Sequence, residues 1–519
     1  MDKRTRRMIG QMISAGFPSP FVDEQARRIT EEFEVGNYYI FGRNVVNTEQ
    51  LCALTKDLSE LAFQKNGVSP FICLDQEGGA VSRIAVGASL FPGAMALAAS
   101  GSGQAHEVGK NSGEILRALG LTSTAAPVLD VNVEPLNPII GARAFSDDTE
   151  TVAEYGTKMM LGLKEGGLIS TVKHYPGHGN VKSDSHLTLP FNDTDRKTLE
   201  EKEWYPFQKA FDEGAEAIMS AHVVYPSVDP EWPATLSKVF MTDILRNQQH
   251  FTGIVETDCM EMDAVRKTYG IGPASVRAIE AGCDLLTFSH TYEAVKEGVT
   301  AIYEAVESGR IPIKRIEESY MRIMALKEKY GLLQPRGIDN RKADELIWNK
   351  EKNELHTLLS RNSITLLSDN GGLNAFQNSK KPLFVAPPSL ALNGAEDPKV
   401  NPLCFSETFA QKLGGTSIVI PLNEMNDAIK SKIENADFDA AVIGLYNARF
   451  RPGQMKTLEI LKNSGKPVIC VLLGAPYDVS DIKDVSAVIA AYEYTVLSVN
   501  SLIHALTHGE FPGKSPVKL

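Results

Sequence analysis

The sequence contains no long hydrophobic run, no excess of basic residues and few cysteines. Nowhere in its 519 residues do about 18 apolar residues follow one another, which excludes an ordinary membrane-spanning helix. The formal net charge of -12 argues against a protein that binds nucleic acid phosphates, because such proteins carry a basic surface. The six cysteines are scattered without a C-x-x-C pair, and most lie in apolar runs, as small core residues do.

The N-terminus is basic, but neither an apolar run nor a small-residue cleavage site follows it, so we expect no secretory signal. The cytoplasm is therefore the predicted compartment. With 43% hydrophobic and 23% charged residues, the composition is that of a soluble globular protein. The length is enough for about two or three domains.

Residues 1–331 alternate short apolar segments with longer amphipathic ones, which is typical of a parallel sheet covered by helices. The pattern is compatible with a closed barrel or an open sheet. The predicted strands are residues 38–41, 70–74, 124–129, 167–172, 217–221, 253–257 and 284–288. Nearly all of them end in polar residues, and in a barrel such strand ends converge on one face and one pocket.

Residues 351–519 show a second alternation of the same kind, which predicts a three-layer α/β sandwich. Its predicted strands are residues 364–367, 382–385, 417–420, 440–444, 468–472 and 487–490. Residues 332–350, with Pro335, Gly337 and a run of charges, are predicted to link the two domains.

Residues 173–190, KHYPGHGNVKSDSHLTLP, contain the densest group of candidate catalytic side chains in the sequence. Asp184 and His186 lie two residues apart, and a carboxylate beside an imidazole fixes its tautomer and raises its basicity. This pair indicates general acid/base catalysis near neutral pH. The alternative is that both residues only cap and cross-link a long loop.

A metal site is a further alternative for this stretch. His174, His178, Asp184 and His186 are residue types that bind zinc or manganese. However, the glycine and proline residues between the first two histidines forbid the helical i, i+4 spacing that aligns two such ligands.

Two other strand ends carry charged residues. After the second predicted strand comes DQEGGAVSR, in which paired glycines allow a tight turn that leaves Asp75 and Arg83 pointing to one side. Arg143 lies in IGARAFS, after the third predicted strand. The alternatives are a solvated turn for the first segment and a surface salt bridge for Arg143.

Residues 255–262 read VETDCMEM and place three carboxylates at the end of an apolar strand. Carboxylates there are costly unless a pocket solvates or uses them. Strand alternation puts Glu256 and Asp258 on the same face, so the periodicity does not choose between them, and Glu261 stays a weaker candidate.

Together these motifs resemble the N-acetylglucosaminidase branch of glycoside hydrolase family 3. The resemblance rests on KH-aromatic-PGHG followed by DSH, on D-x-E-G-G-x-V-x-R, on I-G-x-R-x-F and on T-D-x-x-x-M. The closing residues 511–517 also resemble the family's final P-x-G-K-x-P-V, with one residue fewer. The resemblance implies a TIM-type (β/α)8 barrel followed by a three-layer α/β/α sandwich domain.

The resemblance also implies roles for individual residues. Asp258 is the expected nucleophile, His186 the acid/base, and Asp184 the residue that orients His186. The residues expected to bind the sugar are Asp75, Arg83, Arg143, Lys173 and His174. The implied enzyme is a retaining β-N-acetylhexosaminidase that needs no cofactor or metal and acts on N-acetylglucosamine glycosides from muropeptides or chitin-type oligosaccharides.

Three other activities remain open from the sequence. A neutral histidine does not repel phosphate as a carboxylate does, so a phosphorylase that releases a sugar 1-phosphate fits the same residues. A metal-dependent hydrolase would use the histidine-rich loop, and a sugar-binding protein without catalysis would use the pocket alone.

Overall fold

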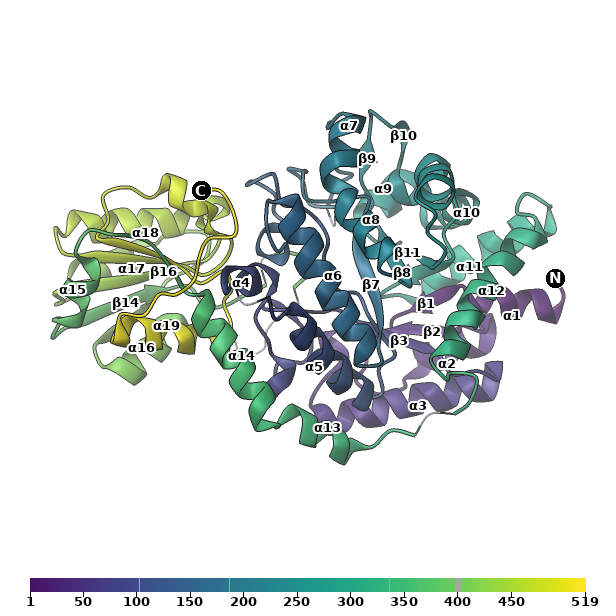
Figure 1. Ribbon diagram of the computed structural model, residues 1–519, viewed down its shortest axis with the longest axis horizontal. Coiled ribbons are helices and arrows are strands. Elements are labelled where there is room, and N and C mark those ends of the chain that lie inside the picture. Colours follow the sequence, from purple (N-terminus) through teal and green to yellow (C-terminus); the bar gives the residue numbers. More distant parts are fainter. Residues whose placement is uncertain (102, 186, 336, 392, 397–402) are drawn as a thin grey trace.

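The computed structural model describes residues 1–101, 103–185, 187–335, 337–391, 393–396 and 403–519, and Figure 1 shows a barrel joined to a smaller α/β domain. In this part of the chain eight parallel strands close the barrel in the order β1-β12-β11-β8-β7-β6-β3-β2. The strands are β1 (Ile13–Ala15), β2 (Asn37–Tyr39), β3 (Phe71–Leu74), β6 (Ser123–Thr124), β7 (Ile169–Tyr175), β8 (Ala217–Ser220), β11 (Ile254–Cys259) and β12 (Leu285–Phe288). The predicted barrel fold is confirmed.

Three details of the barrel differ from the sequence prediction. Strand β1 has three residues, too few for a visible alternation, and was not predicted. Strand β6 ends at Thr124, and the chain rejoins β7 only at a Val128–Lys173 bridge; Pro127, which has no N–H group, lies between. Strand β7 runs through Lys173 and His174 to Tyr175, three residues beyond its predicted end.

Helices cover the outside of the barrel, and their ends follow local sequence signals. Helix α3, for example, begins after Asn47, whose side chain accepts a hydrogen bond from the backbone N–H of Gln50, and ends at Gly67, which has a φ of 75°. The helices are α1 (Lys3–Gln11), α2 (Glu24–Phe33), α3 (Thr48–Asn66), α4 (Ala94–Ala99), α5 (Ala105–Ala118), α6 (Thr149–Glu165), α7 (Arg196–Thr198), α8 (Tyr205–Asp212), α9 (Asp263–Tyr269), α10 (Ile271–Ala281), α11 (Tyr292–Glu307) and α12 (Ile313–Lys329).

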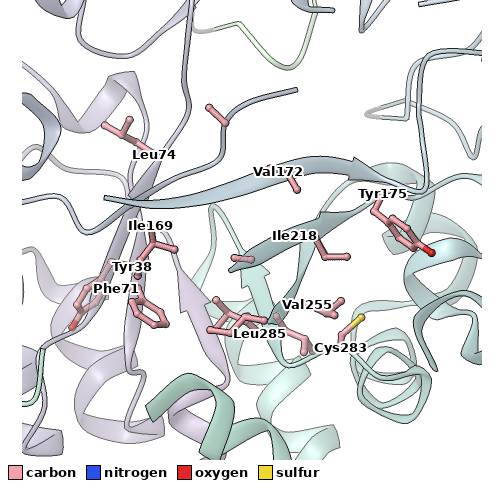
Figure 2. Packing of buried hydrophobic residues seen from close by; sticks show 14 of the residues in the cluster. Tyr38, Phe71, Leu74, Ile169, Val172, Tyr175, Ile218, Val255, Cys283 and Leu285 are labelled. Atoms are coloured by element: carbon pink, nitrogen blue, oxygen red, sulfur yellow. The ribbon is translucent and has the colours of Figure 1, made fainter. Parts of the chain in front are cut away.

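The strands of the barrel alternate between its interior and the helices. Phe71, Ile169 and Leu285 line a small cavity inside the barrel. Val172, Ile218 and Val255 stand at the alternate positions and pack outward. Figure 2 shows how closely these residues pack, and all six are buried.

Two helices lead from the barrel to the second domain. Helix α13 (Asn340–Ile347) lies within the predicted linker and packs against α3 and α5. Helix α14 (Lys350–Ser363) follows it and runs along the molecule towards the smaller domain (Figure 1).

The second domain is built on a six-stranded sheet in the order β13-β18-β17-β16-β14-β15, in which only β13 is antiparallel to its neighbour. Its strands are β13 (Thr365–Asp369), β14 (Pro382–Ala386), β15 (Thr416–Val419), β16 (Ala440–Leu445), β17 (Val468–Leu472) and β18 (Ala487–Ala490). Its helices are α15 (Gly372–Gln377), α16 (Phe405–Leu413), α17 (Asp427–Glu434), α18 (Pro452–Asn463) and α19 (Val496–His508). One hydrophobic cluster packs the sheet on α16 and α19 and another packs it on α17 and α18, which makes the predicted three layers.

The two domains meet at helix α4. Met95 and Ala96 of this helix form a hydrophobic cluster with Tyr477 and Tyr492 of the second domain. The C-terminal segment also lies on the barrel domain, because the backbone N–H of Lys514 donates to the carbonyl of Ala99 at 3.0 Å. Within the described residues, no helix combines the length and the apolar character that crossing a membrane requires.

Candidate active site

A cavity of about 370 Å³ opens at the C-terminal ends of the barrel strands. Parallel strands in a barrel all end on one face, so residues from distant parts of the sequence meet there. Six of the predicted site residues line this cavity, namely Asp75, Arg83, Arg143, Lys173, His174 and Asp258.

Asp75 and Lys173 form a buried ion pair on the cavity wall, with Lys173 Nζ 2.7 Å from Asp75 Oδ1. Arg83 donates to the other carboxylate oxygen at 2.9 Å, and the Tyr39 hydroxyl donates to Oδ1 at 2.9 Å. Burial alone would raise the pKa of Asp75, but the positive charges of Lys173 and Arg83 outweigh it and hold this pKa below its usual range. Asp75 is therefore a fixed, charged acceptor for hydroxyl groups.

Glu77 extends this network to the next loop. Its carboxylate lies 2.6 Å from Lys173 Nζ and receives two hydrogen bonds from Arg143, each of 2.8 Å. Burial by itself would raise the pKa of Glu77, but the charges of Arg143 and Lys173 outweigh it and lower this pKa to about 2. Glu77 was not predicted as a site residue, although it stands in the motif that predicted Asp75 and Arg83.

Asp130 holds His174, near the end of strand β7, and His178, in the loop that follows. His174 Nδ1 lies 2.7 Å from Asp130 Oδ2, and the backbone N–H of His178 donates to Asp130 Oδ1 at 2.6 Å. Burial and the neighbouring His174 lower the pKa of His178 to about 4, so its ring is neutral at neutral pH. Asp130 was missed as a functional residue, and its one sequence signal is its place after a predicted strand.

The loop that follows carries the predicted acid/base pair. His186 lies outside the described residues. Asp184 is half-buried and does not itself line the cavity; its carbonyl accepts hydrogen bonds from the backbone N–H groups of Leu187 and Thr188 at 3.0 and 2.9 Å. Ser185 does line the cavity, and its Oγ lies 3.0 Å from His178 Nε2.

The three carboxylates in and just after strand β11 occupy different environments. Glu256 lies deeper inside the barrel, outside the main cavity, and accepts a hydrogen bond from the Thr287 hydroxyl at 2.9 Å. Burial raises its pKa to about 7. Glu261 lines the cavity but also accepts backbone hydrogen bonds from His290 and Thr291 at 2.6 and 3.1 Å. Glu256 and Asp258 therefore differ in their depth in the barrel, a difference that the strand alternation did not predict.

His222, at the end of β8, is buried and does not line the cavity. Its ring nitrogens lie 2.9 Å from the Thr235 hydroxyl and 3.1 Å from the carbonyl of Cys259. It therefore braces the strand end that carries Asp258.

The second domain also reaches the cavity. Gly394, Ala395 and Glu396 line its rim, and Glu396 Oε2 accepts a hydrogen bond from the Tyr446 hydroxyl at 3.2 Å. Asn393 donates to the carbonyl of Pro138, in the barrel domain, at 3.3 Å. This contribution was not predicted, because the segment carries no motif.

Comparison with known proteins decides the family. Residues 4–326, most of the chain, match the model of the family described as "Glycosyl hydrolase family 3 N terminal domain". The chain belongs to glycosyl hydrolase family 3. The protein is therefore a glycoside hydrolase, and the matched region contains the barrel and every predicted site residue.

Three similar proteins match this chain over all or part of its length. A β-N-acetylglucosaminidase from Paenibacillus sp. str. FPU-7 superposes with a TM-score of 0.93 at 34% identity, covering 99% of this chain and 98% of that one. Beta-hexosaminidase A of Pseudoalteromonas piscicida is 27% identical over 510 residues, 90% of this chain and 84% of that protein. A beta-hexosaminidase of Chromobacterium violaceum is 36% identical over 259 residues, 49% of this chain and 71% of that protein.

Two of the four candidate metal ligands, His174 and His178, make other contacts in this site, with Asp130 and Ser185. In the parts of the chain that the structure describes, no three histidine, cysteine or carboxylate side chains are placed to hold a metal ion. His174 instead directs Nδ1 at Asp130, a contact that orients its ring.

Proposed function

We propose that the protein is a retaining β-N-acetylhexosaminidase that removes terminal β-linked N-acetylglucosamine. The observation that carries this proposal is the likeness of the whole chain to the Paenibacillus β-N-acetylglucosaminidase, at 34% identity and a TM-score of 0.93. The relatives named beta-hexosaminidase support the same activity.

Asp258 is the nucleophile in this proposal. Retention requires a carboxylate that attacks the anomeric carbon and a proton donor on the other side of the scissile bond. Asp258 lines the cavity, whereas Glu256 lies below it and Glu261 binds the backbone ahead of α11. The backbone N–H of Cys259 donates to Asp258 Oδ1 at 2.7 Å, which holds the carboxylate in a fixed orientation.

His186 is the proposed acid/base, with Asp184 holding its tautomer. The support for His186 comes from the D-S-H motif and from Ser185, the preceding residue, which lines the cavity. An imidazole has a pKa of about 6.5, so it can donate a proton to the leaving oxygen and then activate water near neutral pH. The sugar would leave with retained configuration after hydrolysis of the covalent intermediate.

The ion-pair network would bind the sugar hydroxyls. Asp75, Arg83, Lys173, His174 and Arg143 combine buried carboxylate, ammonium, guanidinium and imidazole groups that lie in fixed positions before substrate arrives. Such preorganised groups lose little entropy on binding and position the anomeric carbon for attack.

The substrate class we propose is a soluble carbohydrate. Terminal N-acetylglucosamine occurs in muropeptide fragments of the cell wall and in chitin-type oligosaccharides, and we propose that the enzyme degrades such fragments in the cytoplasm.

The deciding experiment is turnover of an aryl β-N-acetylglucosaminide with and without inorganic phosphate, with the sugar product identified by mass. We expect free N-acetylglucosamine at a rate that does not depend on phosphate. Asp258→Ala should lower kcat by about 10³-fold or more. A sugar 1-phosphate that forms only with phosphate would instead make the enzyme a phosphorylase, and full activity of Asp258→Ala would contradict the assigned nucleophile.

A further inference from the structure

Glu493, a buried carboxylate of the second domain, contacts the barrel domain. It follows strand β18 and is 4% exposed. Its Oε2 accepts a hydrogen bond of 2.6 Å from the backbone N–H of Gly93, which precedes helix α4 of the barrel domain. Its Oε1 accepts a hydrogen bond of 2.9 Å from the Thr495 hydroxyl in its own domain. The carboxylate therefore spans the domain boundary.

The same carboxylate lies against the tip of a short hairpin. Strands β4 (Gln76–Gly78) and β5 (Val81–Ser82) pair antiparallel, and Gly79 begins the turn between them with a φ of 56°. A methyl group on Gly79 would lie 2.9 Å from Glu493 Oε2 and 2.9 Å from the Cα of Gly93. Only a glycine leaves room for such an approach, so the hairpin tip is seated between Glu493 and Gly93.

This hairpin carries much of the sugar-binding network. Asp75 precedes it, Glu77 lies within it and Arg83 follows it, and all three line the active-site cavity. Glu77 in turn lies 2.6 Å from Lys173 Nζ and binds Arg143. A shift of the hairpin tip would therefore move Glu77, which holds Lys173 and Arg143 in the site.

The backbone before Glu493 is held in an uncommon conformation. Tyr492 has a φ of 64°, a left-handed conformation that is rare for a bulky residue and persists only where the surroundings impose it. Its hydroxyl donates to the Thr365 hydroxyl at 2.8 Å, and its ring packs on Met95 and Ala96. These contacts direct the next side chain, Glu493, towards the hairpin.

The buried carboxylate is also costly to keep. Burial raises the pKa of Glu493 to about 7, so the side chain is partly ionised at neutral pH in an enclosed site. Glu493 plays no part in the chemistry derived above, and a glutamine would fit the same space without this cost.

We propose that Glu493 is a positioning residue through which the second domain holds the sugar-binding hairpin in place. Glu493 does not touch the sugar; it supports the Gly79 turn and thereby fixes Asp75, Glu77 and Arg83 around it. The inference rests on the proposed function only in its choice of substrate, because the hairpin contact itself is independent of the reaction.

The kinetic test compares Glu493→Ala, Glu493→Asp and Glu493→Gln with the wild type on the aryl glycoside. Removing or retracting the carboxylate should raise KM, and the inhibition constant of N-acetylglucosamine, by about tenfold with kcat within about threefold. Glu493→Gln should retain near wild-type constants, because its amide oxygen still accepts from Gly93. Glu459→Ala, at an exposed position on α18, is the matched control and should change nothing.

A second measurement does not depend on turnover. Amide hydrogen exchange of residues 76–83 should quicken in Glu493→Ala and Glu493→Asp but not in Glu459→Ala or Glu493→Gln. Unchanged KM, inhibition constant and exchange in correctly folded Glu493→Asp would overturn the inference. A wild type that does not cleave the glycoside would overturn the proposed function alone, since the exchange measurement would still decide the role of Glu493.

Discussion

The carboxylate of Glu203 accepts hydrogen bonds from Nδ2 of Asn192 at both of its oxygens, at 3.1 and 2.9 Å. Glu203 ends a π-helical turn, Leu199–Glu203, and also lies against Gly177, where an added methyl group would be 2.9 Å from Glu203 Oε2. Gly177 and Asn192 flank the segment that contains Asp184 and Ser185. One buried side chain thus joins the two ends of the predicted catalytic loop.

The free energy of unfolding should depend on pH through Glu203. Burial raises its pKa to about 8, whereas an unfolded glutamate has a pKa of about 4.3. Between these values the folded state binds more protons than the unfolded state, so stability falls as pH rises through this window and then levels off. Glu203→Gln removes this dependence and should gain roughly 4 kcal/mol relative to the wild type between pH 5 and pH 9.

Thermal melts at pH 5, 7 and 9 measure this effect. Glu200→Gln, in an exposed ion pair with Arg196 on the same turn, is the control and should follow the wild type within about 0.5 kcal/mol. A constant difference between Glu203→Gln and the wild type across this range would show that Glu203 ionises normally.

Lys173→Met should destabilise the protein as well as inactivate it. The side chain is 2% exposed and lies within 2.7 Å of Asp75 and 2.6 Å of Glu77. Removing the ammonium group leaves two buried carboxylates close together, which costs about 3–5 kcal/mol when a buried ion pair is broken. Denaturant unfolding measures the loss, and Lys182→Met, 73% exposed in the loop that follows strand β7, should change stability by less than about 0.5 kcal/mol.

Substitution of the two carboxylates of strand β11 should affect kcat to very different extents. Asp258→Ala should lose about 10³-fold or more in kcat, whereas Glu256→Gln, which can keep its hydrogen bond with Thr287, should lose less than about tenfold. Azide provides the sharper measurement, because a small anion can enter the space that the nucleophile leaves. Turnover restored by azide in Asp258→Ala, with an α-glycosyl azide as product, is the expected result; restoration in Glu256→Ala instead would move the nucleophile to Glu256.

Chelation should leave the activity unchanged. In the described part of the chain no three ligand-type side chains are grouped for a metal ion, and the proposed mechanism uses only protein groups. Hydrolysis of the aryl glycoside is measured after dialysis against EDTA. Activity that is lost on dialysis and restored by zinc or manganese would return the histidine-rich loop to the metal-dependent alternative.

Much of the fold was predictable because its signals are local. Alternation within short apolar segments located seven of the barrel strands and all six strands of the second domain, since each needs only a few neighbouring residues to show its pattern. Strand β1 was missed because three residues carry too little periodicity. Strand β7 was predicted too short because Lys173 and His174 are polar, although an ion pair with Asp75 and a hydrogen-bond contact with Asp130 allow both to be buried in the strand.

The candidate site was predictable where its residues stand in contiguous motifs, and it was missed where they do not. Asp75, Arg83, Arg143, Lys173, His174 and Asp258 were assigned from motifs and line one cavity. Asp130 and Glu396 act through partners 44 and 50 residues away, and no local pattern marks such contacts.

The sequence by itself determined which segments become strands and which polar residues follow them, because hydrophobic alternation and turn-forming glycines act over a few residues. The tertiary structure alone decided the depth of Glu256 below Asp258 and the contact between Glu493 and Gly93, which are 400 residues apart. The physical reason is that hydrogen bonds and ion pairs form only between groups within about 3 Å of one another. Which groups from distant parts of the sequence come that close is set by the whole fold.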